Sequence, residues 1–149
     1  MRAVIQRVKS AKVEVDSRVI GKIGPGLLVF LGVSREDNNE DVDYLVEKTI
    51  NLRVFDDEEG KLNLSLLDTQ GEILLVSQFT LLADCRKGRR PSFVDAASPE
   101  LAQKLYNYFI EQIKRRKIPI ATGEFQARME IFLINNGPVT ILLDSKKRF

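Results

Sequence analysis

Three polar side chains stand inside an otherwise apolar segment and have the clearest capacity for chemistry. The segment is "EILLVSQFTLL", residues 72–82, and the polar residues are Ser77, Gln78 and Thr80. Burying a polar side chain without a hydrogen bond costs about 1–3 kcal/mol. Two interpretations are open. Either these side chains bond to neighbouring loops at a strand end, or the strand opens into a pocket, as strands of α/β sheets often do.

The chemistry available to such a pocket is limited, because the chain contains no histidine. A Ser-His-Asp triad, a Cys-His pair and a Cys/His zinc site are therefore excluded. The Thr80 hydroxyl is a candidate nucleophile, but it needs a base, and no lysine or carboxylate lies within 73–82. The backbone N–H groups of Phe79 and Thr80 are an alternative, since one donor aimed at an oxyanion contributes on the order of 10²–10³ in rate.

Two other features with reactive side chains are interpreted as structural. Cys85 is the single cysteine, and although Arg86 and Lys87 would favour its thiolate, a lone thiol without a base indicates an incidental residue. One cysteine also excludes an internal disulfide, so a reducing, cytoplasmic location is expected. The acidic run "DDEEG", residues 56–60, predicts a hairpin turn ended by glycine rather than a metal site, because hard-metal sites need oxygens from separated segments.

A second unusual segment is "LINNGPVTILLD", residues 133–144, in which two apolar runs flank Asn-Asn-Gly-Pro. Asn136-Gly137 is a strong hairpin signal, because both residues tolerate positive φ. Pro138 is unusual there, since it removes a backbone donor where the next strand should begin. The segment is therefore either a turn between two strands or a backbone shaped to contact something.

Basic residues are clustered although the net charge is only +2. The clusters are "RKGRR" at 86–90, "KRRK" at 114–117 and "KKR" at 146–148. Each cluster taken singly is best interpreted as a solvated helix end, loop or tail. Collectively they allow phosphate contacts, which favour Arg and Lys and need no high overall charge.

The strands that must position these residues follow from hydrophobic periodicity. Alternating apolar residues predict half-buried strands, and continuous apolar runs predict strands buried on both faces. The predicted ranges are 2–8, a hairpin over 11–24 that turns at Asp16-Ser17, 27–33, 72–82, 118–125, 129–135 and 138–144.

Two helices are predicted between these strands. The first spans 39–53, with Asn39 as its cap and a stripe of Val42, Leu45, Val46, Thr49 and Leu52. The second begins with Ser98 as cap and Pro99 at its first position, ends at "KRRK", and buries Leu101, Leu105, Phe109, Gln112 and Ile113.

The order of elements predicts one α/β domain with a mixed sheet, helices on one side and further strands on the other. The 149 residues, 44% of them apolar, suit a single domain with its own core. No run approaches the roughly 18 apolar residues of a membrane span. The N-terminus lacks the long apolar core of a signal peptide.

Four segments resemble the D-aminoacyl-tRNA deacylase family, also called the D-tyrosyl-tRNA deacylases. They are "MRAVIQRV" at the start, "SQFTL" at 77–81, "GRRPSF" at 88–93 and "NNGPVT" at 135–140. Their order matches the family, and the resemblance covers essentially the whole chain.

The resemblance implies a three-layer α/β/β fold in an obligate homodimer, with active sites at the interface. It implies hydrolysis of the ester that joins a D-amino acid, or glycine, to the 3′-terminal adenosine of tRNA. No cofactor and no metal ligands are predicted, and the sequence leaves open whether a metal ion assists. "SQFTL" would line the pocket. Gly137–Pro138 would form a cis peptide inserted into the partner's pocket, and Arg7 would support it across the interface. Phe93, Phe125 and Met129 are candidates for binding adenine.

The enzyme would then select D-amino acids by rejecting L-amino acids, because the rigid backbone of Gly137–Pro138 can occupy the place that an L side chain needs. The family resemblance also implies that the 2′-hydroxyl of the terminal ribose assists catalysis, which accounts for the missing histidine. Phe79 and Thr80 are accordingly assigned backbone oxyanion and positioning roles, with a covalent Thr80 mechanism as the minority alternative. Two rival functions are an RNA-binding module without catalysis and a small-molecule esterase. Neither an RNP-type aromatic motif nor a GXXG loop is present to support the first.

Overall fold

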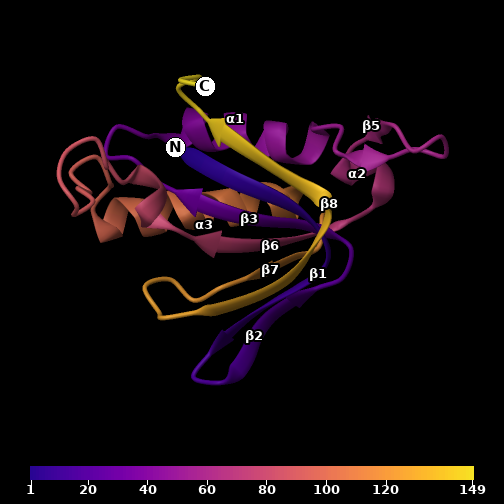
Figure 1. Ribbon diagram of the computed structural model, residues 1–149, viewed down its shortest axis with the longest axis horizontal. Helices are drawn as coiled ribbons and strands as arrows, with labels where there is room; N and C mark the ends of the chain where they lie inside the picture. The colour runs from indigo at the N-terminus through magenta and orange to yellow at the C-terminus, as the bar shows by residue number, and fades with distance from the viewer.

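The computed structural model describes residues 1–149, which form one mixed sheet with helices against it (Figure 1). The sheet strands are β1 (Arg2–Val15), β2 (Arg18–Ile23), β3 (Gly26–Gly32), β6 (Glu72–Ser77), β7 (Ile120–Thr122) and β8 (Glu130–Asp144). The helices are α1 (Asn39–Asn51), α2 (Leu66–Thr69), the 3₁₀ helix η1 (Phe79–Leu82) and α3 (Pro99–Arg115). A small hairpin joins β4 (Phe55–Asp56) to β5 (Leu62–Leu64). The predicted single α/β domain with a mixed sheet is confirmed.

The centre of the sheet is parallel and its N-terminal side is antiparallel. β3 pairs with β6, and β6 with β7, in parallel, while β1 pairs antiparallel with β2, β3 and β8. β3 and β6 are buried along almost their whole length, as their continuous apolar sequences predict. Their carboxyl ends therefore meet at one edge of the sheet, where the polar segment 77–80 begins.

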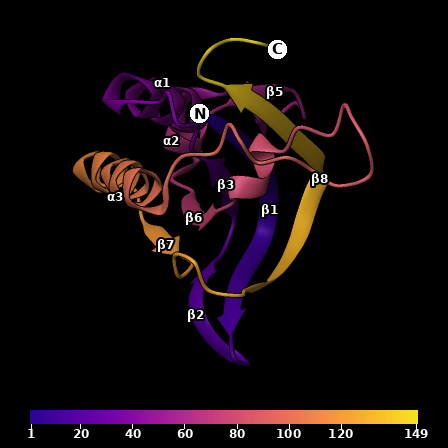
Figure 2. The ribbon, with the colours of Figure 1, turned by 90° about the vertical axis from the view of Figure 1, so that its left-hand side faces the viewer.

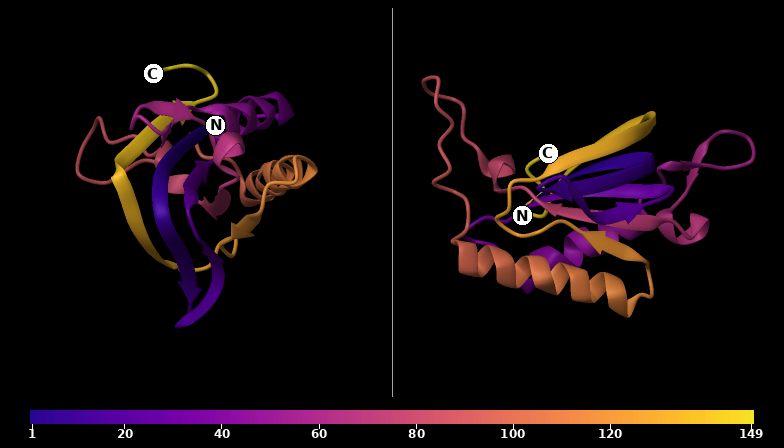
Figure 3. Two further views of the ribbon diagram at one scale, coloured as in Figure 1. Left: turned by 90° about the vertical axis from the view of Figure 1, so that its right-hand side faces the viewer. Right: turned by 90° about the horizontal axis from the view of Figure 1, so that it is seen from below.

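The helices α1 and α3 cover one face of the sheet (Figures 1 and 3). Their apolar stripes pack with β1, β3 and β6 in the main core, which includes Leu45, Leu105, Phe109, Leu75 and Val29. Ser98 caps α3 and Pro99 opens it, as predicted. The predicted cap of α1 is wrong by one residue, because the side chain of Asn38, rather than Asn39, accepts from the Glu40 N–H.

A second, smaller core lies on the opposite face and is built from strands. It contains Val8, Ala11 and Val13 of β1, with Ile23, Leu28, Leu74 and Val76. Figure 2 shows β1 and β8 bending together towards β2. The bend brings β2 against β7 closely enough that a Cβ at Gly21 would lie 2.7 Å from the Thr122 carbonyl oxygen.

Three predicted strand boundaries are wrong. β1 continues to Val15 instead of ending at residue 8, because its inward side chains change from the main core (Ala3, Ile5) to the second core (Val8, Ala11). β6 ends at Ser77 instead of 82, because the chain turns into η1. β7 covers only Ile120–Thr122 of the predicted 118–125.

The predicted turn at Asn136-Gly137 is also wrong as a connection between two strands. β8 is one strand from Glu130 to Asp144, and both of its halves pair with β1. Gln6 faces Thr140 and Val8 faces Asn135, so residues 136–139 bulge out opposite Arg7. The chain thus keeps its direction through a long bulge.

The acidic hairpin agrees with its prediction. Gly60 has a φ of +76° at the turn, and Asp57 accepts hydrogen bonds from the Glu59 and Lys61 N–H groups. Among the helices, none has the length and apolar character that crossing a membrane requires.

Candidate functional site

A cavity of about 570 Å³ opens at the carboxyl ends of β3 and β6, where the sequence predicted a pocket. The start of α3 and the 125–131 segment close its other sides. The lining is mostly apolar and consists of Leu31, Val33, Val76, Ser77, Gln78, Phe79, Ala97, Pro99, Ala102, Tyr106, Phe125, Gln126, Ala127, Met129 and Ile131. No aspartate, glutamate, lysine, arginine or cysteine is among these residues, and the Tyr106 phenol is the one ionisable side chain in the lining.

The 3₁₀ helix η1 starts at the mouth of this cavity. The Gln78 N–H still donates to the Leu31 carbonyl at 2.8 Å, and the chain then leaves the sheet. The N–H groups of Phe79 and Thr80 are the first two of η1, so they have no acceptor within it, and no side chain caps them. Two backbone donors are therefore free at the edge of the pocket.

The Thr80 hydroxyl is not activated by a base. Its Oγ1 accepts a hydrogen bond from Nε2 of Gln78, an amide that cannot take up a proton. Thr80 is exposed and does not line the cavity, whereas Ser77 and Gln78 do. The structure thus separates the predicted "SQFT" residues into pocket-lining side chains and a neighbouring hydroxyl.

Two aromatic residues form the rim of the cavity. The Phe79 ring is 57% exposed and meets the Phe93 ring edge-to-face, with 5.0 Å between centroids. Phe93 does not itself line the cavity, whereas the other adenine candidates, Phe125 and Met129, do. A large exposed ring pair at a pocket mouth is suited to stacking against a planar ligand.

Tyr106 is a buried residue of the pocket lining that was not among the predicted site residues. Its hydroxyl donates to the Leu75 carbonyl at 2.9 Å, and its ring packs 6.0 Å from that of Phe125. Burial raises the pKa of Tyr106, so the phenol remains protonated. Periodicity could have identified Tyr106 as buried, because it follows Leu105 on the buried stripe of α3, but not as part of a pocket.

Gly123 explains the position of Met129 in the cavity wall. A Cβ at Gly123 would lie 2.6 Å from the Met129 sulfur, so a larger residue there would displace the thioether from its present position. Gly123 is tied to the sheet, because its N–H donates to the Leu75 carbonyl at 2.9 Å. The thioether therefore packs directly on the end of the sheet beside the pocket.

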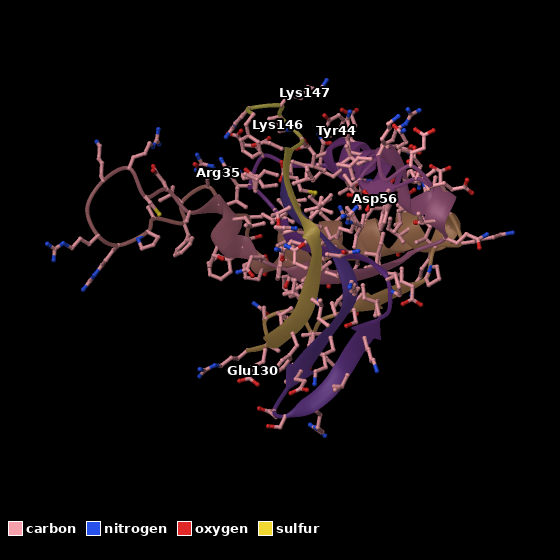
Figure 4. All side chains as sticks on the ribbon, turned by 45° about the vertical axis from the view of Figure 1, so that its right-hand side comes forward. Arg35, Tyr44, Asp56, Glu130, Lys146 and Lys147 are labelled. Carbon is pink, nitrogen blue, oxygen red and sulfur yellow. The ribbon has the colours of Figure 1, made fainter.

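Arg7 is buried and holds the bulge of β8. Its Nε donates to the Asn136 carbonyl at 2.9 Å, and its Nη1 donates to the Val54 carbonyl at 2.8 Å. Nη1 also lies 3.2 Å from a carboxylate oxygen of Asp56, which is labelled in Figure 4. The family resemblance implied that Arg7 supports the Gly137–Pro138 dipeptide across a subunit interface. In the structure Arg7 supports the bulge of its own chain.

Gly137 and Pro138 form the exposed tip of the bulge, and the peptide bond between them is cis. Gly137 has a φ of +129°, and a Cβ there would lie 2.8 Å from Nη2 of Arg7. The Val139 N–H donates to Oδ1 of Asn135 at 3.2 Å, which ties the bulge together. Neither Gly137 nor Pro138 lines the cavity of its own chain.

The exposed Cys85 lies outside the cavity, on a loop that follows η1. Next to it, Asp84 accepts hydrogen bonds from the Arg86 side chain and backbone. The Arg86 guanidinium, together with that backbone N–H, holds the pKa of Asp84 well below its usual range. The pair therefore stays ionised at neutral pH.

The matching family model and the similar curated proteins indicate the same family. The family model described as "D-Tyr-tRNA(Tyr) deacylase" matches residues 4–144. The D-aminoacyl-tRNA deacylase of Thermosipho africanus is 62% identical over all of both chains, and that of Clostridium botulinum strain Hall is 64% identical over all of both chains.

Two solved structures are similar to the fold. One, titled "c-Myc DNA Unwinding Element Binding Protein", has a TM-score of 0.91 and 44% identity over 97% of this chain and 98% of that one. Another, described as a probable eukaryotic D-amino acid tRNA deacylase, has a TM-score of 0.79 over 95% of this chain and 97% of that one. At 18% identity, the second shows the fold alone.

Proposed function

The chain belongs to the D-Tyr-tRNA(Tyr) deacylase family and is a hydrolase acting on aminoacyl-tRNA, and on that premise we propose how it works. It hydrolyses the ester that joins a D-amino acid to the 3′-terminal adenosine of tRNA, releasing the free amino acid and the tRNA. The observation that carries this proposal is a largely apolar cavity with free backbone donors at its mouth and no carboxylate, lysine or cysteine in its lining. Such a site binds and orients a substrate that brings its own catalytic group.

In the proposed reaction, the ribose 2′-hydroxyl assists a water molecule in attacking the ester carbonyl. The N–H groups of Phe79 and Thr80 stabilise the resulting oxyanion. The bond from the carbonyl carbon to the ribose 3′-oxygen then breaks, and that oxygen takes up a proton. The Thr80 hydroxyl has a positioning role, consistent with its hydrogen bond from Gln78.

The adenosine is proposed to bind among Phe125, Met129 and the Phe79–Phe93 rim. These side chains supply aromatic and thioether surface, with Ser77 and Gln78 as hydrogen-bonding groups nearby. No cofactor or metal is needed in this scheme. We place the reaction in the cytoplasm, where aminoacyl-tRNA is used.

Chiral selection is proposed to need a second subunit. The exposed face of the edge strand β8 carries the apolar residues Phe132, Ile134 and Leu142, which a homodimer in a layered α/β/β arrangement would cover. Gly137–Pro138 projects from the same strand and would enter the partner's cavity. Rigid backbone there would exclude an L side chain, whereas a D residue or glycine would fit.

The first test is hydrolysis of three matched substrates that share one tRNA: D-aminoacyl, L-aminoacyl and glycyl. We expect cleavage of the D and glycyl esters and almost none of the L ester. A protein that only binds RNA would cleave none of them, and a general esterase would cleave all three. A D-aminoacyl-tRNA ending in 2′-deoxyadenosine tests the mechanism separately, because an unchanged rate would contradict the role of the 2′-hydroxyl.

A further inference from the structure

A basic arm projects from the mouth of the cavity. It spans residues 84–92 and is closed at its base by two backbone hydrogen bonds between Asp84 and Ser92, of 2.8 and 2.9 Å. Figure 3 (right) and Figure 4 show the arm extending away from the sheet and the helices. Residues 85–92 are all exposed. The arm is therefore a free surface of this chain.

Both ends of the arm are attached to the rim of the pocket. The helix η1, which holds the proposed oxyanion donors, ends at Leu82, and only Ala83 separates it from Asp84 at the base of the arm. Phe93 follows its last residue and packs on Phe79 with 5.0 Å between ring centroids. Anything that leaves the cavity past this ring pair passes the base of the arm.

Most of the arm's positive charge is unpaired. Arg86 is held by Asp84 through two side-chain hydrogen bonds of 2.7 and 2.8 Å, which fixes the base of the arm. Lys87, Arg89 and Arg90 make no ion pair and no side-chain hydrogen bond. Three cations are thus available within a few residues of the pocket, in a chain whose net charge is only +2.

The other two basic clusters do not combine proximity to the pocket with unpaired cations. At 1.5 Å per residue, Lys114 lies roughly 22 Å along α3 from Pro99 at the cavity wall. In the 146–148 cluster, Lys146 pairs with Asp41 at 2.8 Å, and Lys147 lies over the Tyr44 ring (Figure 4). The arm alone is both adjacent to the pocket and largely unpaired.

We propose that the arm binds the sugar-phosphate backbone of the tRNA acceptor end, an inference that rests on the proposed function. An adenosine in the cavity is covalently continuous with a phosphodiester chain, which must leave through the mouth. Lys87, Arg89 and Arg90 are suited to those phosphates, because Lys and Arg contacts to nucleic acid depend on charge and not on sequence. The cavity recognises the aminoacyl end, and the arm holds the RNA that follows it.

The test compares two substrates and two triple variants. Lys87, Arg89 and Arg90 are changed to Gln in one variant, and Lys114, Arg115 and Lys117 in the matched control, so each loses three positive charges. The substrates are D-aminoacyl-tRNA and D-aminoacyl-adenosine, which lacks the phosphodiester chain. Wild-type cleavage of both substrates establishes the proposed function independently of the arm.

We expect the arm variant to lose at least about tenfold in kcat/KM on D-aminoacyl-tRNA. The slope of log(kcat/KM) against the logarithm of the salt concentration should also become less negative by about 2. The arm variant's hydrolysis of D-aminoacyl-adenosine stays at the wild-type rate, as does that of the control variant on both substrates. Equal losses on both substrates, or equal losses for both variants, would overturn the proposal. An arm variant with wild-type kcat/KM on tRNA would overturn it as well.

Discussion

At the scale of single residues, the catalytic question concerns the Thr80 hydroxyl. Its hydrogen-bond partner is the Gln78 amide, and no basic side chain lines the cavity beside it. We therefore expect Thr80→Ala to retain kcat within about tenfold of wild type in single-turnover hydrolysis of D-aminoacyl-tRNA. A loss near 10⁴-fold, with an unchanged circular dichroism spectrum and melting temperature, would instead identify Thr80 as a nucleophile.

A backbone donor can be tested at Phe79, because proline is well tolerated at the first position of a helix. Gln78, with φ of −144° and ψ of 77°, already has an extended φ before that position. Phe79→Pro removes both the ring and the N–H, whereas Phe79→Ala removes only the ring. If the N–H stabilises the oxyanion, kcat of the proline variant should fall about 10²–10³-fold below that of the alanine variant. Equal values of kcat would exclude that role.

The candidate site could be predicted in part from individual residues. Ser77 and Gln78 stood out because polar side chains in an apolar strand need an explanation, and both line the cavity. Tyr106 did not stand out, because an aromatic residue on a helical stripe has the same pattern whether it fills the core or lines a pocket. Thr80 was grouped with Ser77 because periodicity does not reveal that the strand ends and a 3₁₀ helix begins.

At the scale of elements, the bulge in β8 shows why a local signal can predict the wrong structure. Asn-Gly favours a reversal of the chain, but both flanks of the bulge pair with β1 over its whole length, so the strand continues. Those long-range pairs, together with the contacts of buried Arg7, determine the outcome. No pattern within residues 133–144 contains that information.

Gly137 should be sensitive to substitution for a steric reason. A Cβ at its φ of +129° would lie 2.8 Å from Nη2 of Arg7 and 2.9 Å from a methyl carbon of Val139, so Gly137→Ala must shift either these side chains or the bulge. We expect L-aminoacyl-tRNA hydrolysis to rise while the fold is kept. The matched control is Gly60→Ala, at a φ of +76° with nothing within 4 Å, which should change stability by about 1–2 kcal/mol and leave chirality unaffected. Unchanged rejection of L substrates by Gly137→Ala would contradict the proposal that Gly137–Pro138 acts as a gate, meaning a rigid backbone segment that excludes L side chains from the cavity.

The end of β8 is fixed to the start of α1 by Asp41, which makes this junction dependent on pH. Burial alone would raise the pKa of Asp41, but hydrogen bonds from Lys146, Ser145 and the Asn38 N–H lower the pKa overall. The stability that these bonds contribute is present above the ordinary aspartate pKa and is lost as pH falls through the lower pKa of the folded state.

Asp41→Asn should therefore lower the free energy of unfolding by about 1–3 kcal/mol at neutral pH, since charge-assisted hydrogen bonds are lost. The difference from wild type should shrink as pH falls below about 4 in urea titrations. Glu58→Gln, at an exposed residue of the acidic hairpin, is the control and should unfold like wild type. If the free energies of unfolding of the Asp41 variant and wild type differed by a constant amount over this pH range, the proposed dependence of stability on Asp41 ionisation would be contradicted.

At the scale of the whole molecule, the sequence predicted the fold class better than its geometry. Continuous apolar runs identified the buried strands β3 and β6, and helical stripes identified α1 and α3. The curl of β1, β2 and β8 over a second core could not be predicted. It arises because the inward side chains of β1 pack into the main core before Val8 and into the second core from Val8 onward. That curl gives β8 its exposed outer face, and with it the surface proposed for dimerisation.

The proposed dimer makes a prediction that no single chain can satisfy, because each cavity would be paired with the gate of the other subunit. Two defective variants can therefore correct one another. Gly137→Ala damages the gate, and Ala127→Trp places a large ring in the cavity wall. A purified heterodimer of the two, isolated through two different tags, contains one intact cavity facing one intact gate.

We expect this heterodimer to hydrolyse D-aminoacyl-tRNA at about half the rate of the wild-type dimer and to reject the L substrate, since one of its two sites is intact. The Gly137→Ala homodimer should cleave both substrates, and the Ala127→Trp homodimer should cleave neither. If the gate acted within its own chain, the intact cavity would keep its damaged gate. The heterodimer would then cleave L-aminoacyl-tRNA, and the ratio of D to L rates decides between the two arrangements.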